Sequence, residues 1–127
     1  MAAPNILSLT TATPHTVTLT PSDTSRNALV TAPSSGQAHK INQLIVANID
    51  GAAAVDCTVE LRLADGTTYR AIASTISVPA DASLIVIDKT MMLYLLDTSV
   101  SGEPSTIYVT SGTASKLTYT CSYETLS

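Results

Sequence analysis

The sequence predicts an all-β protein: a single antiparallel β-sandwich, jelly-roll-like, with an extended N-terminal arm. Three observations predict this fold class. Serine and threonine together exceed a quarter of the 127 residues, and β-branched threonine suits the surface of a pleated sheet. Apolar and polar residues alternate over short stretches, and clusters of Gly, Pro, Asp and Ser separate these stretches. A chain of this length can bury a core of its own within one domain.

We divide the chain into an extended N-terminal arm (1–27) and a β-sandwich domain (28–127). The arm is rich in Thr, Ser and Pro and carries no charge before Asp23. Within it, residues 16–20 alternate and predict an edge strand that Pro21 ends. The arm is either a flexible tail or an extended segment that pairs with a neighbouring subunit. On the second interpretation, the candidate partner-interface residues are Ile6, Leu7, Leu9, Val17 and Leu19.

From residue 28 onwards, short strands are separated by turn residues. Over residues 55–62 every second side chain is apolar, and the polar side chains between them share the opposite face. Residues 116–124, the last expected strand, alternate in the same way. The other expected strands are 28–32, 40–48, 67–73, 75–78 and 106–110, and the expected turns are 33–36, 50–51, 65–66, 79–81 and 111–112.

Two further stretches are apolar without alternation. Residues 83–87 form a continuous apolar run, which predicts a strand covered on both faces. Residues 91–96 are the most hydrophobic window of the chain. A strand is expected there rather than a helix, because Asp88 and Asp97 bound a segment that is too short for a good helix. Residues 99–104 are expected to form a loop.

The two cysteines, Cys57 and Cys121, both fall on the apolar phase of their expected strands. One interpretation is two buried free thiols that act as small hydrophobic side chains. The other is a single cross-strand disulfide, which requires neighbouring strands and an oxidising compartment. The count of two does not choose between them, and we take the free thiols as the expectation.

The charge and hydropathy of the chain argue against several classes of partner. The formal net charge is −4, and the six basic residues are scattered along the sequence. Because nucleic-acid binding needs clustered Lys and Arg, we expect no nucleic-acid partner. No apolar run approaches the roughly eighteen residues of a membrane span, so we expect no membrane partner. The N-terminus lacks the pattern of a signal peptide and is typical of an intact cytoplasmic start.

The sequence shows no catalytic or metal-binding pattern. The only histidines, His15 and His39, lie in the arm and at a strand start, and each is interpreted as an ordinary exposed residue. No Gly-x-Ser-x-Gly elbow, Gly-rich phosphate loop or close set of zinc ligands occurs. We therefore expect neither an enzyme nor a cofactor. Six aspartates at strand ends are expected to cap turns rather than bind calcium: Asp50, Asp56, Asp65, Asp81, Asp88 and Asp97.

Several segments of the chain resemble small structural proteins in the virions of tailed bacteriophages. The matching segments are 40–51 (KINQLIVANIDG), 57–61 (CTVEL), 69–72 (YRAI), 77–84 (SVPADASL) and 122–124 (SYE). Members of that group look like compact β-sandwich subunits that coat the capsid or join the head, neck and tail. The resemblance implies a non-enzymatic protein that is made in the host cytoplasm and located in the virion.

The first hypothesis that the resemblance implies is a capsid decoration (cement) subunit. It would bind the major capsid protein as a symmetric homo-oligomer, with a trimer favoured. The alternative within the same class is a neck or tail connector subunit. A hypothesis of a different class is a carbohydrate-binding β-sandwich module, for which Tyr69 and Tyr108 are the candidate residues. A third hypothesis, a metal-dependent enzyme, requires a bound metal.

Overall fold

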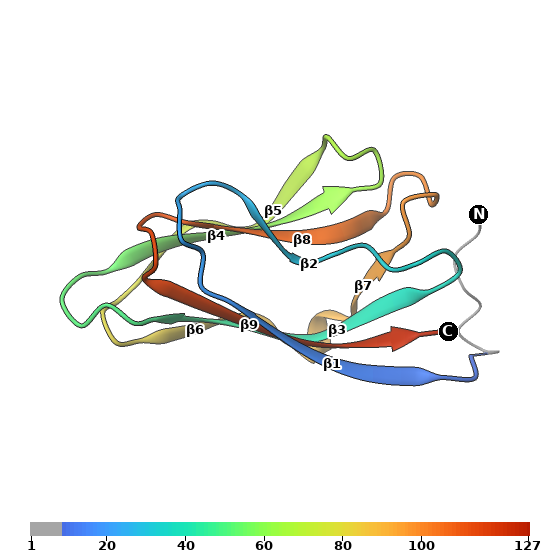
Figure 1. Cartoon of the computed structure of the whole chain (residues 1–127), viewed down its shortest axis with the longest axis horizontal. Coiled ribbons are helices and arrows are strands. Elements are labelled where there is room, and N and C mark those ends of the chain that lie inside the picture. The colour runs from blue at the N-terminus through green and yellow to red at the C-terminus, as the bar shows by residue number, and fades with distance from the viewer. Residues whose placement is uncertain (1–8) are drawn as a thin grey trace.

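The computed structural model describes residues 9–127 and consists of two antiparallel sheets packed face to face (Figure 1). In sheet A the strand order is β1-β9-β3-β6, and β7 also pairs with β3. In sheet B the order is β2-β8-β4-β5. The elements are β1 (Ala12–Leu19), β2 (Asn27–Val30), β3 (Ala38–Asn48), β4 (Val55–Leu63), β5 (Tyr69–Val78), β6 (Ser83–Ile87), the 3-10 helix η2 (Lys89–Met91), β7 (Leu93–Leu96), β8 (Pro104–Ser111) and β9 (Leu117–Leu126).

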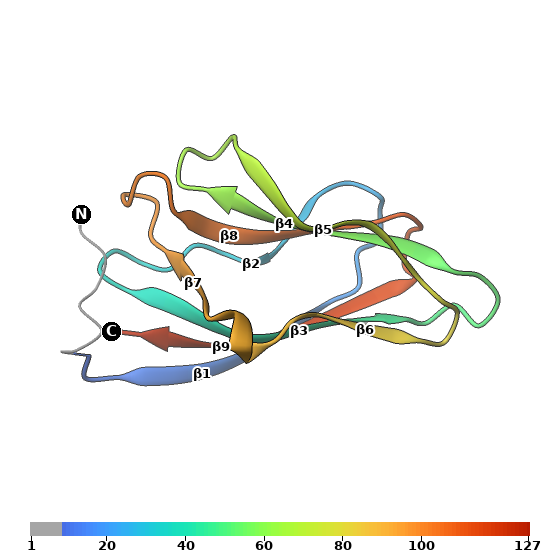
Figure 2. The ribbon, with the colours of Figure 1, turned by 180° about the vertical axis from the view of Figure 1, so that it is seen from behind.

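The chain crosses repeatedly between the two sheets, which is the connectivity of a jelly roll. β1, β3 and β9 lie in sheet A, whereas β2, β4 and β8 lie in sheet B. β6 and β7 behave as one interrupted strand, because both pair with β3 in the antiparallel sense. Two interleaved sheets of this kind define the jelly-roll architecture. The predicted β-sandwich is therefore confirmed, and Figure 2 shows the same two layers from behind.

The alternating stretches fold as their patterns predict. In β4, Val55, Cys57 and Val59 are buried, while the residues between them are exposed or half-buried. β9 buries every second residue in the same way over its first half. The two strands expected on either side of Ser74 are joined into β5, where Thr75 has a left-handed φ of 53°. Polar–apolar alternation thus identifies the core face of both central strands.

The core lies between the sheets and is filled by side chains from both. Its largest fully buried side chain is Tyr119 of β9, whose hydroxyl donates a hydrogen bond to the Thr110 carbonyl at 3.1 Å. Burial raises the pKa of Tyr119 to about 12, so the hydroxyl stays protonated. The largest fully buried aliphatic side chains are Ile41, Leu44, Ile87, Leu95, Ile107 and Leu117.

The two cysteines are buried free thiols on opposite sheets. Cys57 lies in β4 of sheet B, and Cys121 lies in β9 of sheet A, so their strands are not hydrogen-bonded neighbours. Burial raises the pKa of Cys121 to about 12 and also raises the pKa of Cys57. The expectation of two buried thiols is confirmed, and the alternative of a cross-strand disulfide is wrong.

Four of the six aspartates that were expected to cap turns do so, whereas Asp56 lies within β4 and the Asp81 side chain accepts no hydrogen bond from residues 9–127. The Asp65 carboxylate accepts hydrogen bonds from the backbone N–H groups of Thr67 at 2.9 Å and Thr68 at 2.8 Å. The Thr68 hydroxyl and these N–H groups lower the pKa of Asp65 from 3.8 to about 2. Side chains that cap a backbone N–H two residues ahead are also found at Asp50, Asp88 and Asp97.

The expectation that residues 83–87 are covered on both faces is wrong. This segment is β6, an edge strand of sheet A, and its side chains alternate in exposure. Ile87 is fully buried, whereas Ile85 is 57% exposed. The apolar run is continuous in sequence, but only one of its faces is covered by the core.

The hydrophobic window over residues 91–96 is divided between two elements. It begins at the end of η2 and continues as β7, which pairs with β3. Met92, between them, has a left-handed φ of 54°. The expected strand is thus present in the second part of the window. In the described part of the chain, no helix has the length and apolar character that crossing a membrane requires.

Candidate interaction surfaces

The structure separates the residues that were predicted to contact a partner. Val17 and Leu19 of β1 are half-buried and pack against the core, so their side chains are occupied within the sandwich. Leu9, which precedes β1, is half-buried. Ile6 and Leu7 lie outside the described residues. The open edge of β1, rather than these two inward side chains, is the part of this strand that faces outwards in sheet A.

A pocket of about 410 Å³ opens where the β2–β3 connection passes over sheet A. The His15 ring stacks on Tyr123 with ring centroids 5.0 Å apart, and His39 meets the same tyrosine edge-on at 4.8 Å. These rings come from β1, β9 and β3, which are neighbours in the sheet. The lining residues are Thr13, His15, Thr31, Ala32, Pro33, Ser34, Gln37, His39, Tyr123 and Thr125.

The two histidines of this pocket differ in environment. His15 is exposed, as expected, but His39 is only 8% exposed, so the expectation that it is a surface residue is wrong. Burial and the nearby His15 lower the pKa of His39. Its Nδ1 atom lies 3.0 Å from the Thr125 hydroxyl. In residues 9–127, no three His, Cys, Asp or Glu side chains are grouped closely enough to hold a metal ion.

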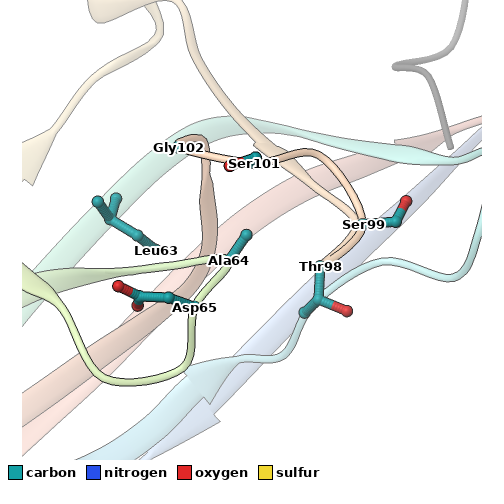
Figure 3. Close-up of a pocket in the computed structure, with 7 residues that line it drawn as sticks. All are labelled: Leu63, Ala64, Asp65, Thr98, Ser99, Ser101 and Gly102. Carbon is teal, nitrogen blue, oxygen red and sulfur yellow. The ribbon is translucent and has the colours of Figure 1, made fainter.

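Another open pocket, of about 370 Å³, lies between the β4–β5 turn and the β7–β8 loop (Figure 3). Asp65 is its ionisable lining residue, and the hydrogen bonds of its own turn already engage that carboxylate. The pocket therefore offers small hydroxyl groups and no group prepared for catalysis. Its lining residues are Leu63, Ala64, Asp65, Thr98, Ser99, Ser101 and Gly102.

One open edge of sheet A is apolar. We call residues 83–96, which comprise β6, η2 and β7, the apolar edge. Three of its side chains are widely exposed: Ile85 at 57%, Met91 at 49% and Met92 at 64%. Its only two charged residues are Asp88, which precedes η2, and Lys89, the first residue of η2. The strands β6 and β7 themselves carry no charge, and exposed apolar side chains beside an uncharged strand edge are typical of an interaction surface.

The other sheet edges carry features that discourage strand pairing. β1 contains Pro14, β2 spans four residues with a bulge, and β5 has bulges and the left-handed Thr75. β6 also has a bulge, between Ile85 and Ile87, but it contains neither proline nor charge. The apolar edge is thus the least protected of the edges in residues 9–127.

A polar cluster lies on the outer face of sheet B. We call its members Arg26, Glu60, Arg62, Tyr69 and Tyr108 the arginine–tyrosine cluster. Arg26 donates from Nε and Nη2 to the two carboxylate oxygens of Glu60, at 2.9 and 3.2 Å. Its guanidinium carbon lies 3.9 Å from the centroid of the Tyr69 ring. The rings of Tyr69 and Tyr108 meet edge to face, with centroids 5.5 Å apart.

Arg62 repeats only part of the arrangement at Arg26. Its guanidinium carbon lies 4.9 Å from the centroid of the Tyr108 ring. However, Arg62 forms no ion pair with any residue that the structure describes. Its Nε atom is buried and has no hydrogen-bond partner within residues 9–127. A buried donor without a partner costs about 1–3 kcal/mol, so Arg62 is a partly desolvated cation that has no ion-pair partner among residues 9–127.

Sequence patterns identify part of this cluster but not its assembly. The alternation of residues 55–62 places Glu60 and Arg62 on one polar face, and Tyr69 and Tyr108 are candidates for a binding surface. No local signal places Arg26 beside Glu60, which is 34 residues away in the sequence. That contact depends on the pairing of β2 and β4 with the two sides of β8.

Comparisons with known proteins give a weak likeness in structure. No family model and no curated protein matches the chain. A structure of the infectious bursal disease virus Gx strain is 14% identical, with a TM-score of 0.37, over 89% of this chain and 32% of that chain. The crystal structure of an icosahedral particle of the same virus is 14% identical, with a TM-score of 0.40, over 89% of this chain and 31% of that chain.

The chain thus spans about a third of the length of those viral proteins. At 14% identity and TM-scores of 0.40 or less, the likeness carries no conclusion about what this chain does.

Proposed function

We propose that this chain is a structural subunit of a virus particle, of the kind found in tailed bacteriophages. In this role it decorates the capsid. Copies of the chain assemble with one another through the apolar edge, and the assembly binds the major capsid protein. The observation that carries the proposal is the apolar edge itself, an uncovered aliphatic surface on a well-packed sandwich. The resemblance of residues 40–51 and 77–84 to virion proteins supports the same role.

The apolar edge supplies a modest free energy at each contact. Fully burying an Ile or Met side chain contributes about 1.5–3 kcal/mol. Because Ile85, Met91 and Met92 are 49–64% exposed, closing them off contributes about 3–5 kcal/mol in total. Association alone costs about 4–15 kcal/mol in lost translational and rotational freedom. A single such contact is therefore weak, and the edge is suited to assemblies in which each subunit makes several contacts.

The backbone of β6 adds to this contact. One side of the strand pairs with β3, and no described strand pairs with its other side. An incoming strand can use the unpaired N–H and C=O groups, and the alternate side chains then fix its position. Backbone pairing combined with an apolar rim favours a symmetric association of identical chains over a contact with an unrelated flat surface.

The decisive experiment compares two matched substitutions, Ile85→Lys and Ile49→Lys. Both isoleucines are 57% exposed, but only Ile85 belongs to the apolar edge. We expect the wild-type mass, measured by light scattering after gel filtration, to be a multiple of 13.2 kDa: twice this value where β6 pairs with β6 of one other copy, and three times where the apolar edge contacts a different surface of the next copy. Ile85→Lys should produce a monomer, because the lysine blocks both burial and edge pairing, while Ile49→Lys should behave as wild type.

A wild-type chain that stays monomeric at every concentration, and that does not bind capsids, contradicts the proposal. The number of copies in purified particles distinguishes a capsid decoration subunit from a neck or tail connector. Decoration requires copies spread over the whole capsid lattice, whereas a neck or tail connector forms a single ring.

A further inference from the structure

The arginine–tyrosine cluster contains two stacked arginines, of which only one has a carboxylate partner. Arg26 and Arg62 lie against tyrosine rings at 3.9 and 4.9 Å. Arg26 binds Glu60 through two parallel hydrogen bonds. Arg62 has no ionic partner in the described part of the chain. The pair at Arg26 shows which ligand a guanidinium held in this way accepts, and residues 9–127 do not supply an equivalent carboxylate for Arg62.

Arg62 lies on a sheet that holds half of the basic residues of the chain. All three arginines of the chain, Arg26, Arg62 and Arg70, flank or lie within strands of sheet B, where Asp56 and Glu60 of β4 are the acidic residues. The carboxylate of Glu60 balances one of them. Opposite charges attract more strongly near a protein surface than in bulk water, because the protein screens them less. A partly desolvated arginine on this face therefore favours an anionic ligand.

The burial of the Arg62 guanidinium limits which of its N–H groups a ligand can contact. Nε of Arg62 is buried, so the two Nη groups are the donors that an external group can reach. Their parallel N–H bonds match the two oxygens of a carboxylate. Tyr108 restrains the plane of the guanidinium before any ligand arrives, which lowers the entropy lost on binding.

We propose that the outer face of sheet B binds an acidic segment of a partner polypeptide, with Arg62 receiving an Asp or Glu carboxylate of that segment. Tyrosine and arginine are the side chains that dominate many protein interfaces. A sugar or a nucleotide base would need an open aromatic face to stack on. Here guanidinium groups cover one face of Tyr69 and one face of Tyr108, and the two rings meet each other edge to face.

This surface is separate from the apolar edge, which belongs to sheet A. The binding of an acidic segment does not depend on how copies of the chain assemble. The two proposals can therefore fail independently: a monomeric chain could still bind the acidic segment, and an oligomer could fail to bind it.

The test uses the full chain, labelled with nitrogen-15 in arginine, and an octaglutamate peptide as the probe. We expect the Nε–H signal of Arg62 to shift as the peptide is added. Arg62→Gln should weaken peptide binding about tenfold, whereas the matched change Arg70→Gln should weaken it less than about twofold. Both substitutions alter the net charge equally, so the difference between them isolates the stacked site. If Arg62→Gln impairs folding, Arg62→Lys serves in its place. Lysine keeps the positive charge but lacks the two parallel N–H donors of the guanidinium, so it should also weaken binding.

Two results would overturn this proposal. One is an equal loss of octaglutamate binding in the Arg62 and Arg70 variants, which would mean unspecific attraction to positive charge. The other is tighter binding of inorganic phosphate or of cellohexaose than of octaglutamate, which would mean a phosphate or a glycan site. Preferential octaglutamate binding that depends on Arg62 supports the assignment of an acidic polypeptide partner.

Discussion

Asn48, at the end of β3, is buried with its amide fully hydrogen-bonded. Its Nδ2 donates to the carbonyls of Ala53 and Val78, each at 2.9 Å. Its Oδ1 accepts from the backbone N–H of Asp50 at 2.8 Å. One side chain thus ties the β3–β4 loop to the end of β5, and so links sheet A to sheet B.

We expect Asn48→Ala to destabilise the fold by about 2–3 kcal/mol, because it removes the donor from the buried Val78 carbonyl and from the part-buried Ala53 carbonyl. The measurement is the free energy of unfolding in urea. Asn42→Ala is the control: Asn42 is half-buried and makes one long hydrogen bond, 3.5 Å, to Glu124, so its loss should cost less than about 1 kcal/mol. Similar effects of the two changes would contradict the role given to Asn48.

His39 makes stability depend on pH. The ionisable groups that face it are His15 of β1 and Tyr123 of β9, with the Thr125 hydroxyl at hydrogen-bond distance. Burial is the larger cause of its lowered pKa, and His15 is the next. Since the folded-state pKa lies below the ordinary 6.5, the unfolded chain binds the proton first as the pH falls.

The contribution of neutral His39 to stability is therefore complete above pH 6.5 and is lost as the pH falls from 6.5 through the lowered folded-state pKa. We expect the melting temperature to decline over this range, and His39→Gln to flatten the decline. His15→Gln should reduce it only in part, because burial of His39 remains. A profile that His39→Gln leaves unchanged would show that another group is responsible.

At the level of strands, polar–apolar alternation predicts which face of a strand is buried, whereas a continuous apolar run does not. β4 and β9 lie at the centre of their sheets, where one face meets the core, so their period of two is visible in the sequence. β6 has the composition of a strand covered on both sides but lies at an edge. Sequence cannot separate these cases, because a core and a partner surface select the same side chains.

The same limit applies to the candidate surfaces. The polar phase of β4 identifies the face that carries Glu60 and Arg62, because it follows from local periodicity. The stacking of Arg26 on Tyr69 and of Arg62 on Tyr108 depends on which strands are neighbours, and that order is set by long-range pairing. Val17 and Leu19 were predicted to contact a partner because they are apolar residues of an edge strand. Their side chains pack against the core instead, and local sequence does not show which way such side chains face.

The placement of the cysteines on strands of opposite sheets gives a prediction about opening of the sandwich. Cys57 and Cys121 are both fully buried, and burial raises the pKa of each thiol. We expect neither to react with an aromatic disulfide reagent at neutral pH in the folded chain, and both to react once urea separates the sheets. Rapid labelling of the folded chain, or an intact mass two hydrogens below the reduced value, would contradict this arrangement.

At the level of the whole molecule, the two proposed surfaces lie on different sheets. The strands β6 and β7 of the apolar edge belong to sheet A, and the strands β4, β5 and β8 that carry most of the arginine–tyrosine cluster belong to sheet B (Figures 1 and 2). A subunit can therefore contact its own copies and an acidic partner at the same time. Each contact is modest on its own, but an oligomer presents several copies of Arg62 to a repeated partner, which turns weak contacts into stable attachment.

This coupling predicts different outcomes for the same substitution in two formats. In solution, Ile85→Lys should bind a single octaglutamate peptide as tightly as the wild type, because the apolar edge is remote from Arg62. On a surface densely coated with the peptide, the wild-type oligomer should be retained at least about tenfold more strongly than the Ile85→Lys monomer. Surface retention can be followed by optical biosensing at matched subunit concentration. Equal retention of the two chains would mean that assembly and attachment are not combined in one particle-binding unit.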